Sequence, residues 1–233
     1  MMETWDYEPV EDFDKTPIER LSSFPRQPDM LWYAVRFAAH VAIRVWLKIW
    51  HRYRVIGREH LPKDVPFVMV ANHASHLDAM CLLSALPLRS IQKTYPAAAK
   101  DYFFTTVTKV AFAAIVVNAM PFDRKDNPRE SINLCRELLG TPGHALILFP
   151  EGTRSATGAM GPFKAGIGYL TAGTNVPVVP CYLHGAFRAW PKGAWVARPF
   201  RLELRIGEPV TFALESDPKA VAASVEQKVK ALA

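Results

Sequence analysis

Short apolar runs alternate with stretches of helical periodicity along most of the chain. Residues 67–71 and 145–149 are short, apolar runs bounded by turn residues, which predicts buried strands. Further strands are expected at residues 54–57, 176–181 and 202–206, and a short helix followed by a strand around residues 115–117 in the run 110–122. Helices are expected at residues 79–86, 127–140 and 218–232. Strands separated by helices predict an α/β fold with a mixed, largely parallel sheet flanked by helices.

The prolines in residues 176–181 bear on where that strand lies. Pro177 and Pro180 cannot donate to a sheet ladder, so the sequence predicts that they lie at an edge or at a strand end.

Residues 30–53 carry basic side chains at every fourth position. These residues are Arg36, His40, Arg44, Lys48 and Arg52. The spacing places them in one stripe along a helix whose other faces carry tryptophan and aliphatic residues. A spanning helix needs about 20 mostly apolar residues, and the stripe interrupts every such window. The pattern is typical of an amphipathic helix lying in the membrane interface, and the alternative is a long surface helix packed on the protein's own core.

Charge separates the start of the chain from the rest. Residues 1–29 are acidic and contain several prolines, which predicts an irregular arm, and they lack the basic-then-apolar pattern of a signal peptide. The net charge of the whole 233-residue chain is nevertheless +6, because residues 1–30 carry −5 and the remaining residues 31–233 carry +11. A basic body favours anionic partners such as phosphate-bearing ligands or a membrane surface, and no nucleic-acid-binding motif is present.

Three cysteines, Cys81, Cys135 and Cys181, lie far apart in the sequence. Their spacing predicts a reducing compartment and no cysteine-built metal site.

The first candidate site lies between the strand at residues 67–71 and the helix that follows it. His73 comes at the strand end and Asp78 at the helix start. In one continuous helix these side chains would lie roughly 140° apart, whereas a strand, turn and helix can bring them together. A carboxylate bonded to one ring nitrogen fixes the tautomer and leaves the other nitrogen as a general base. The alternative is that Ser75 and Asp78 form a capping box that serves only the helix.

A second candidate site, Glu151-Gly152-Thr153-Arg154, follows the strand at residues 145–149 and therefore lies at the same sheet edge. The glycine allows a ligand to approach the backbone, and the guanidinium fork of Arg154 suits phosphate oxygens. Arg124 also follows an expected strand, so two arginines can converge on one phosphate.

A dinuclear metal hydrolase is a rival interpretation, because His76 lies close to His73. The usual H-x-H-x-D-H pattern is not present, since Ser75 and Ala79 stand where further ligands belong. No metal site is therefore expected.

Four segments resemble, in order and spacing, the motifs of the glycerophospholipid acyltransferases, and most closely the 1-acylglycerol-3-phosphate acyltransferases. They are N-H-x4-D at residues 72–78, Phe122-Asp123-Arg124, F-P-E-G-T-R-S at residues 149–155 and V-P-V-V-P at residues 176–180. The resemblance covers roughly residues 53–210. It implies that His73 is the general base, that Asp78 orients it, and that the acceptor's glycerol phosphate is bound by Arg124, Glu151, Gly152, Thr153, Arg154 and Lys100.

The expected function follows from this resemblance. An acyl group would pass directly, without an acyl-enzyme, from acyl-CoA or acyl-carrier protein to the sn-2 hydroxyl of 1-acylglycerol-3-phosphate, which gives phosphatidic acid. No cofactor is expected beyond the thioester co-substrate, and the expected location is the cytoplasmic face of the cell membrane. Two alternatives stay open: an acyltransferase for another lysolipid acceptor, and a non-catalytic lipid-binding module.

Overall fold

The computed structural model of the chain describes residue 24 and residues 29–99, 106–215 and 217–233. The predicted arm at residues 1–29 falls almost entirely outside these ranges, and so does Lys100.

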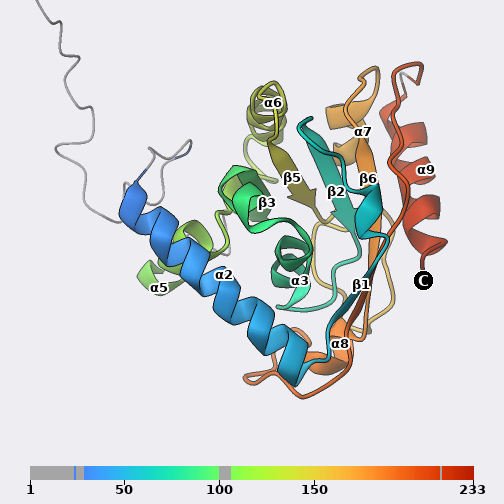
Figure 1. The fold of residues 1–233 in the computed structure, drawn as a ribbon. Coiled ribbons are helices and arrows are strands. Elements are labelled where there is room, and N and C mark those ends of the chain that lie inside the picture. Colours follow the sequence, from blue (N-terminus) through green and yellow to red (C-terminus); the bar gives the residue numbers. More distant parts are fainter. Residues whose placement is uncertain (1–23, 25–28, 100–105, 216) are drawn as a thin grey trace, which may run out of the picture.

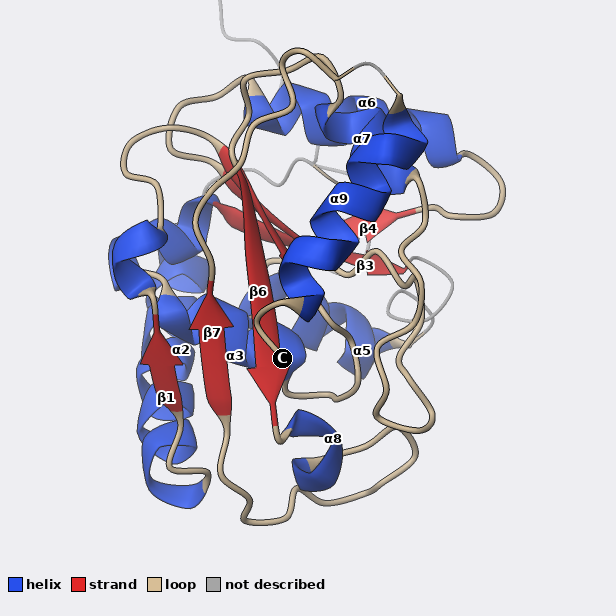
Figure 2. Cartoon of the chain, turned by 90° about the vertical axis from the view of Figure 1, so that its right-hand side faces the viewer, coloured by secondary structure: helices blue, strands red, loops and turns tan. Residues whose placement is uncertain are grey.

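A seven-stranded sheet forms the middle layer of the molecule (Figures 1 and 2). Its order is β1-β7-β6-β2-β5-β3-β4, and within the described residues β6 and β7 pair antiparallel while the other neighbours pair parallel. The strands are β1 (Arg54–Ile56), β2 (Phe67–Ala71), β3 (Thr94–Ala99), β4 (Met120–Phe122), β5 (Ala145–Leu148), β6 (Val178–His184) and β7 (Glu203–Ile206). The predicted mixed, largely parallel sheet is confirmed.

Helices cover both faces of this sheet. The α-helices are α2 (Met30–Trp50), α3 (Asp78–Ala85), α5 (Val107–Ala111), α6 (Pro128–Leu139), α7 (Gly166–Thr171), α8 (Ala186–Ala189) and α9 (Pro218–Lys230). Shorter turns are η1 (Arg58–His60), η2 (Leu88–Lys93) and the π-helical η3 (Phe112–Val116). One face packs against α2, α3, η3 and α8, and the other against α6, α7 and α9.

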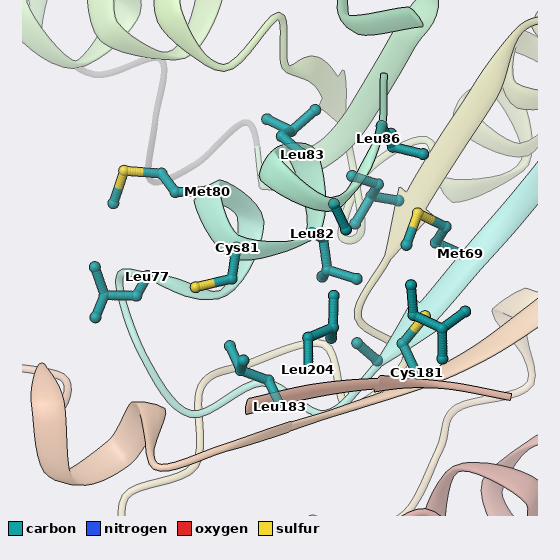
Figure 3. Close-up of a cluster of buried hydrophobic side chains, with 14 of the residues drawn as sticks. Met69, Leu77, Met80, Cys81, Leu82, Leu83, Leu86, Cys181, Leu183 and Leu204 are labelled. Atoms are coloured by element: carbon teal, nitrogen blue, oxygen red, sulfur yellow. The ribbon is translucent and has the colours of Figure 1, made fainter. Parts of the chain in front are cut away.

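Strand β2 shows why the sheet is covered on both sides. Met69 and Ala71 point into the cluster beneath α3, which Figure 3 shows, while Val68 and Val70 point into the cluster beneath α9. Every residue of β2 is buried. A continuous apolar strand of this kind is typical of a parallel sheet between two helical layers.

Helix α2 confirms the predicted helix, but the first part of its basic stripe, Arg36, His40 and Arg44, faces the protein. Arg36 is buried, and its Nε and Nη2 atoms donate to the carbonyl oxygens of Ile115 and Ala114, each at 2.8 Å. Nε2 of His40 lies 2.9 Å from the carbonyl oxygen of Val116. Burial is the main cause that lowers the pKa of Arg36 to about 10 and also lowers the pKa of His40. The stripe therefore binds the carbonyl end of η3.

The opposite face of α2 is apolar and exposed. Its exposed large side chains are Met30, Leu31, Val35, Phe37, Val41, Val45, Ile49 and Trp50. Over the described ranges, no helix is both long enough and apolar enough to cross a bilayer.

The predicted strand at residues 115–117 is wrong. The chain there forms η3, which continues α5, and the strand β4 begins only at Met120. Asn118 ends the helical stretch with a φ of +55°, and its side-chain amide donates to the carbonyl oxygens of Gln92 and Thr94. The β-branched residues at positions 115–117 favour a strand locally, but α2 supplies donors to the carbonyl groups that the helical turn leaves free.

Pro177 comes directly before the first residue of β6, as predicted, whereas Pro180 lies within this inner strand, so the prediction is wrong for Pro180. The pairing of β6 with β7 runs from Cys181 to His184 and so begins one residue after Pro180. The Pro180 carbonyl still accepts from the N–H of Gly207 at 2.8 Å. Its missing N–H therefore falls outside the β6–β7 ladder.

Candidate active site

A cavity of about 420 Å³ lies at the carboxyl ends of β2, β3, β4 and β5. One end is polar and includes His73, Arg124, Arg154, Lys164 and Lys192. The part of the cavity beside α3, β3 and η3 is the apolar end and includes Met80, Ala98, Phe112, Ala113 and Val117. A volume of this size fits a ligand with one charged and one apolar part.

His73 and Asp78 are in contact at the polar end. Nδ1 of His73 lies 2.8 Å from Oδ2 of Asp78, so the imidazole donates to the buried carboxylate and Nε2 is the nitrogen left to act as a base. The His73 ring stacks on Phe149, with ring centroids 4.2 Å apart. The same Oδ2 atom accepts from the N–H groups of Ala74 and Ser75, each at 2.8 Å. Asp78 therefore holds both the turn and the ring, so the interpretation in which it serves only the helix is wrong.

The carboxylate of Glu151 holds the backbone of the site. Oε1 accepts from the N–H of His73 at 2.6 Å, and Oε2 accepts from the N–H of Gly161 at 2.8 Å. The carbonyl oxygen of His73 in turn accepts from the N–H of Ser155 at 2.8 Å. Glu151 is buried, and burial raises the pKa of its carboxyl group although both hydrogen bonds oppose that shift. The two strand-end loops are thus linked on both sides of His73.

Gly152 lies between two cationic side chains. Arg124 donates to its carbonyl oxygen. Its φ is +72°, and an added Cβ would lie 2.8 Å from Nζ of Lys164, so only glycine fits here without strain. Arg124 and Lys164 both approach Gly152, and both line the cavity.

Arg154 lies against a second histidine. Its Nη1 atom is 2.7 Å from both ring nitrogens of His76, and the His76 ring packs on Trp190 with centroids 5.2 Å apart. Burial and the neighbouring guanidinium lower the pKa of His76 to about 4. His76 is therefore neutral near pH 7, and the charge at this point belongs to Arg154.

With this geometry in view, a family model supplies the decisive comparison. The model described as Acyltransferase matches residues 52–184, which is more than half of the chain. The chain belongs to the acyltransferase family. This confirms the resemblance that the four motifs indicated.

Named relatives of this acyltransferase domain agree with one another. This chain is 34% identical to a chloroplastic 1-acyl-sn-glycerol-3-phosphate acyltransferase of Brassica napus over 163 residues. The matched region is 66% of this chain and 45% of that protein. This chain is also 33% identical to the human 1-acyl-sn-glycerol-3-phosphate acyltransferase alpha over 132 residues, 55% of this chain and 44% of that protein. The chain thus spans less than half the length of these two relatives.

A solved structure supports the fold of the acyltransferase domain. The crystal structure of the 1-acyl-sn-glycerophosphate acyltransferase PlsC from Thermotoga maritima matches with a TM-score of 0.68 and 27% sequence identity. The match covers 85% of this chain and 77% of that chain.

The acyltransferase domain brings most of the predicted site residues to one cavity. His73, Arg124, Gly152, Thr153 and Arg154 all line it. The carboxylates of Asp78 and Glu151 are buried behind it and bind backbone N–H groups. Lys100 lies outside the described residues.

Sequence reasoning gave no role to three further residues at the cavity, namely His76, Trp190 and Lys192. A signal existed only for His76, as a second imidazole inside the first motif. The position of the other two depends on a contact distant in sequence, because the Ser75 hydroxyl donates to the carbonyl oxygen of Trp190 at 2.7 Å. The described residues contain no group of three or more histidine, cysteine or acidic side chains arranged to hold a metal ion.

Proposed function

We propose that this protein transfers a fatty acyl group from a thioester donor to the sn-2 hydroxyl of 1-acylglycerol-3-phosphate, which yields phosphatidic acid. The observation that carries the proposal is a His73–Asp78 pair in a cavity that is cationic at one end and apolar at the other. The names of the relatives support the same acceptor.

The proposed reaction needs one base. Nε2 of His73 takes the hydroxyl proton while the hydroxyl oxygen bonds to the thioester carbonyl carbon. The C–S bond then breaks, the electron pair leaves with sulfur, and the imidazolium returns the proton to the thiolate. The products are an ester and a free thiol. Asp78 stabilises the imidazolium that exists between these steps.

The cations would fix the acceptor. Arg124, Arg154 and Lys164 line the polar end and can bind the phosphate, which places the sn-2 hydroxyl near His73. Gly152 and Thr153 line the cavity in the same loop and would let the phosphate approach the backbone closely. We assign Glu151 a positioning role instead of direct phosphate contact, because both carboxylate oxygens accept from backbone N–H groups and a carboxylate repels phosphate. Lys100 remains a proposed phosphate contact from the family resemblance alone.

The apolar end of the cavity would hold the acyl chain. Its wall is formed by η3, and α2 binds the carbonyl groups of that wall. The donor can be acyl-CoA or acyl-carrier protein, since the basic side chains Lys164 and Lys192 suit either anionic carrier.

Membrane contact is part of the proposal. The exposed apolar face of α2 would lie among lipid headgroups and upper acyl chains, where acceptor and product reside. The free, buried thiols of Cys81, Cys135 and Cys181 fit a reducing compartment and hence the cytoplasmic face of the membrane.

The test is thiol release from an acyl thioester by the purified protein in detergent, with and without lysophosphatidic acid. We expect release that requires the acceptor. Arg154→Ala should raise the KM for lysophosphatidic acid about tenfold to a hundredfold with a smaller change in kcat, because one charge-assisted contact is lost. Arg136→Ala, on the surface of α6, is the matched control.

Each other outcome names a rival. Release without an acceptor indicates a thioesterase. Release with another lysolipid in place of lysophosphatidic acid indicates a different acceptor. No release with any lysolipid would leave a lipid-binding module, and the proposed reaction would be rejected.

A further inference from the structure

The loop after β6 combines cationic and exposed apolar side chains. Residues 185–201 contain no acidic residue and four basic ones, namely Arg188, Lys192, Arg198 and Arg201. All four of these side chains are exposed. Trp195 is 94% exposed and Val196 73% exposed, and Phe200 is also exposed. A soluble surface rarely presents a fully exposed tryptophan beside further apolar side chains.

Two hydrogen bonds within this loop hold its backbone in place. Nε1 of Trp190 donates to the carbonyl oxygen of Ala194 at 2.9 Å, and the N–H of Arg198 donates to the carbonyl oxygen of Ala189 at 2.8 Å. These bonds close the loop behind Trp195. They fix the backbone on both sides of Trp195.

The same loop is fixed to the end of α2. Nδ1 of His51 lies 3.1 Å from the carbonyl oxygen of Phe200, and the N–H of Leu202 donates to the carbonyl oxygen of His51 at 3.1 Å. Ile49 and Trp50, just before His51, are exposed apolar residues of α2. Figures 1 and 2 show α8 and the loop after it at the same end of the molecule as the C-terminal end of α2. The end of this loop at Phe200 therefore lies next to the C-terminal end of α2.

We propose that residues 190–201, called the tryptophan loop below, form a second membrane contact beside α2, specific for an anionic lipid surface. Tryptophan favours the interface between headgroups and acyl chains, where its ring is apolar and its N–H stays near water. Arg198 and Arg201 reach the anionic headgroups. The absence of acidic side chains from residues 185–201 removes the repulsion that such a surface would otherwise meet.

The tryptophan loop also touches the catalytic turn. The hydroxyl of Ser75 and the N–H of His76 both donate to the carbonyl oxygen of Trp190, at 2.7 and 3.3 Å, and Lys192 lines the cavity. Seating the loop on lipid would therefore hold the cavity next to the bilayer. This last step rests on the proposed function, whereas lipid binding by the loop does not.

Vesicle sedimentation tests the contact with the full chain. Trp195→Ser should weaken binding to mixed phosphatidylglycerol and phosphatidylcholine vesicles about tenfold. Arg198→Gln and Arg201→Gln should each weaken binding to these anionic vesicles about fivefold. Neither substitution should change binding to vesicles of pure phosphatidylcholine, which carry no net charge. The matched control is Leu214→Ser, because Leu214 is an equally exposed apolar residue that lies away from the tryptophan loop. Its neighbour Phe212 accepts a hydrogen bond from the N–H of Gly173, near the amino end of β6, whereas the loop follows the carboxyl end of that strand. Equal binding by Trp195→Ser and the unaltered protein would overturn the inference.

A site-specific label gives an independent readout. The three native cysteines are buried, so Trp195→Cys can carry an environment-sensitive fluorophore selectively. Its emission should shift to shorter wavelength on adding anionic vesicles, whereas the same label in Leu214→Cys should not respond. No shift at position 195 would overturn the inference. A shift caused by an acidic acyl-carrier protein but not by vesicles would also overturn it, since the loop would then bind protein.

Activity assays separate this inference from the proposed function. Trp195→Ser should keep the unaltered rate on a short-chain lysophosphatidic acid dissolved as monomers, and lose about tenfold on the same acceptor type embedded in vesicles. If the unaltered protein turns over neither acceptor, the proposed function fails while the binding experiments still decide the membrane contact. Equal losses on both acceptors would show that the loop acts on the site itself and not through lipid.

Discussion

The two ends of the cavity are both held by buried polar side chains, which are carboxylates at one end and an arginine with a histidine at the other. At the polar end, the carboxylates of Asp78 and Glu151 accept from backbone N–H groups beside His73. At the apolar end, Arg36 and His40 bind backbone carbonyl oxygens of η3. In each case a charged or polar side chain satisfies backbone groups that an irregular segment leaves unpaired.

The difference lies in what each end positions. The carboxylates fix the turn that carries His73, the proposed base, so small displacements there should change the rate of the chemical step. The cationic stripe fixes an apolar wall, so its loss should change stability and the fit of the acyl chain. Substitutions at the two ends should therefore separate into kinetic effects and stability effects.

The largest effect is expected at the base itself. His73→Ala should lower kcat about a thousandfold or more, because general base catalysis is lost while the surrounding backbone bonds remain. Thiol release measures the rate, and circular dichroism checks that the fold survives. His144→Gln, just before the amino end of β5, is the matched control and should keep its activity. Turnover of His73→Ala near that of the unaltered protein would remove the base from the proposed mechanism.

Glu151→Gln should come next, with a loss in kcat of about a hundredfold. The amide retains the shape of the side chain but turns one acceptor into a donor, which then faces the N–H of His73 or of Gly161. Since those bonds hold the backbone of His73, the imidazole moves relative to the acceptor. If KM for the acceptor rises while kcat is retained, Glu151 acts on binding and its assigned positioning role is wrong.

At the apolar end, Arg36→Met should act mainly on stability. It leaves the carbonyl groups of Ala114 and Ile115 without their donor, which should cost about 2 kcal/mol and lower Tm by about 4–8 °C. Lys48→Met is the control, because Lys48 belongs to the same stripe but is exposed. A displaced η3 wall should also change the preferred acyl chain length. Equal Tm values for the two variants would contradict the role given to the buried stripe.

The two ends also differ in how much of their structure the sequence could predict. The turn at residues 72–78 could be predicted because its contacts are local: the strand, the turn and the helix start bring His73 to Asp78. The direction of the stripe on α2 could not, because periodicity places Arg36 and His40 on one face without saying whether water or protein lies against it. Their partners in η3 are more than 70 residues away along the chain. The wrong strand at residues 115–117 has the same cause.

Glu151 shows a similar limit within the site. Its place at a strand end follows from the sequence, whereas its hydrogen bond to the His73 backbone depends on β2 and β5 lying side by side.

The smallest effect of a substitution is expected at His76, because this imidazole is neutral near pH 7. The pKa of His76 is about 4 in the native state and near 6.5 in the unfolded chain, so the unfolded chain binds more protons between these pH values. The free energy of unfolding should therefore fall as pH decreases from 6.5 towards 4. His76→Phe keeps a ring against Trp190 but removes this titrating group, so the free energy of unfolding should fall less steeply with decreasing pH. The change in slope should correspond to less than one proton, because His76 is only half-buried.

Urea unfolding at several pH values measures this difference. His144→Gln serves as the comparison, because the pKa of His144 is also lowered, chiefly by burial, but its ring packs on Tyr95 away from Arg154. Both variants should flatten the pH dependence, yet only His76→Phe should also change the KM for lysophosphatidic acid, since His76 holds the guanidinium assigned to the phosphate. An unchanged KM in His76→Phe would make that histidine part of the packing around Trp190 alone, and the polar end would then owe its geometry to the two carboxylates.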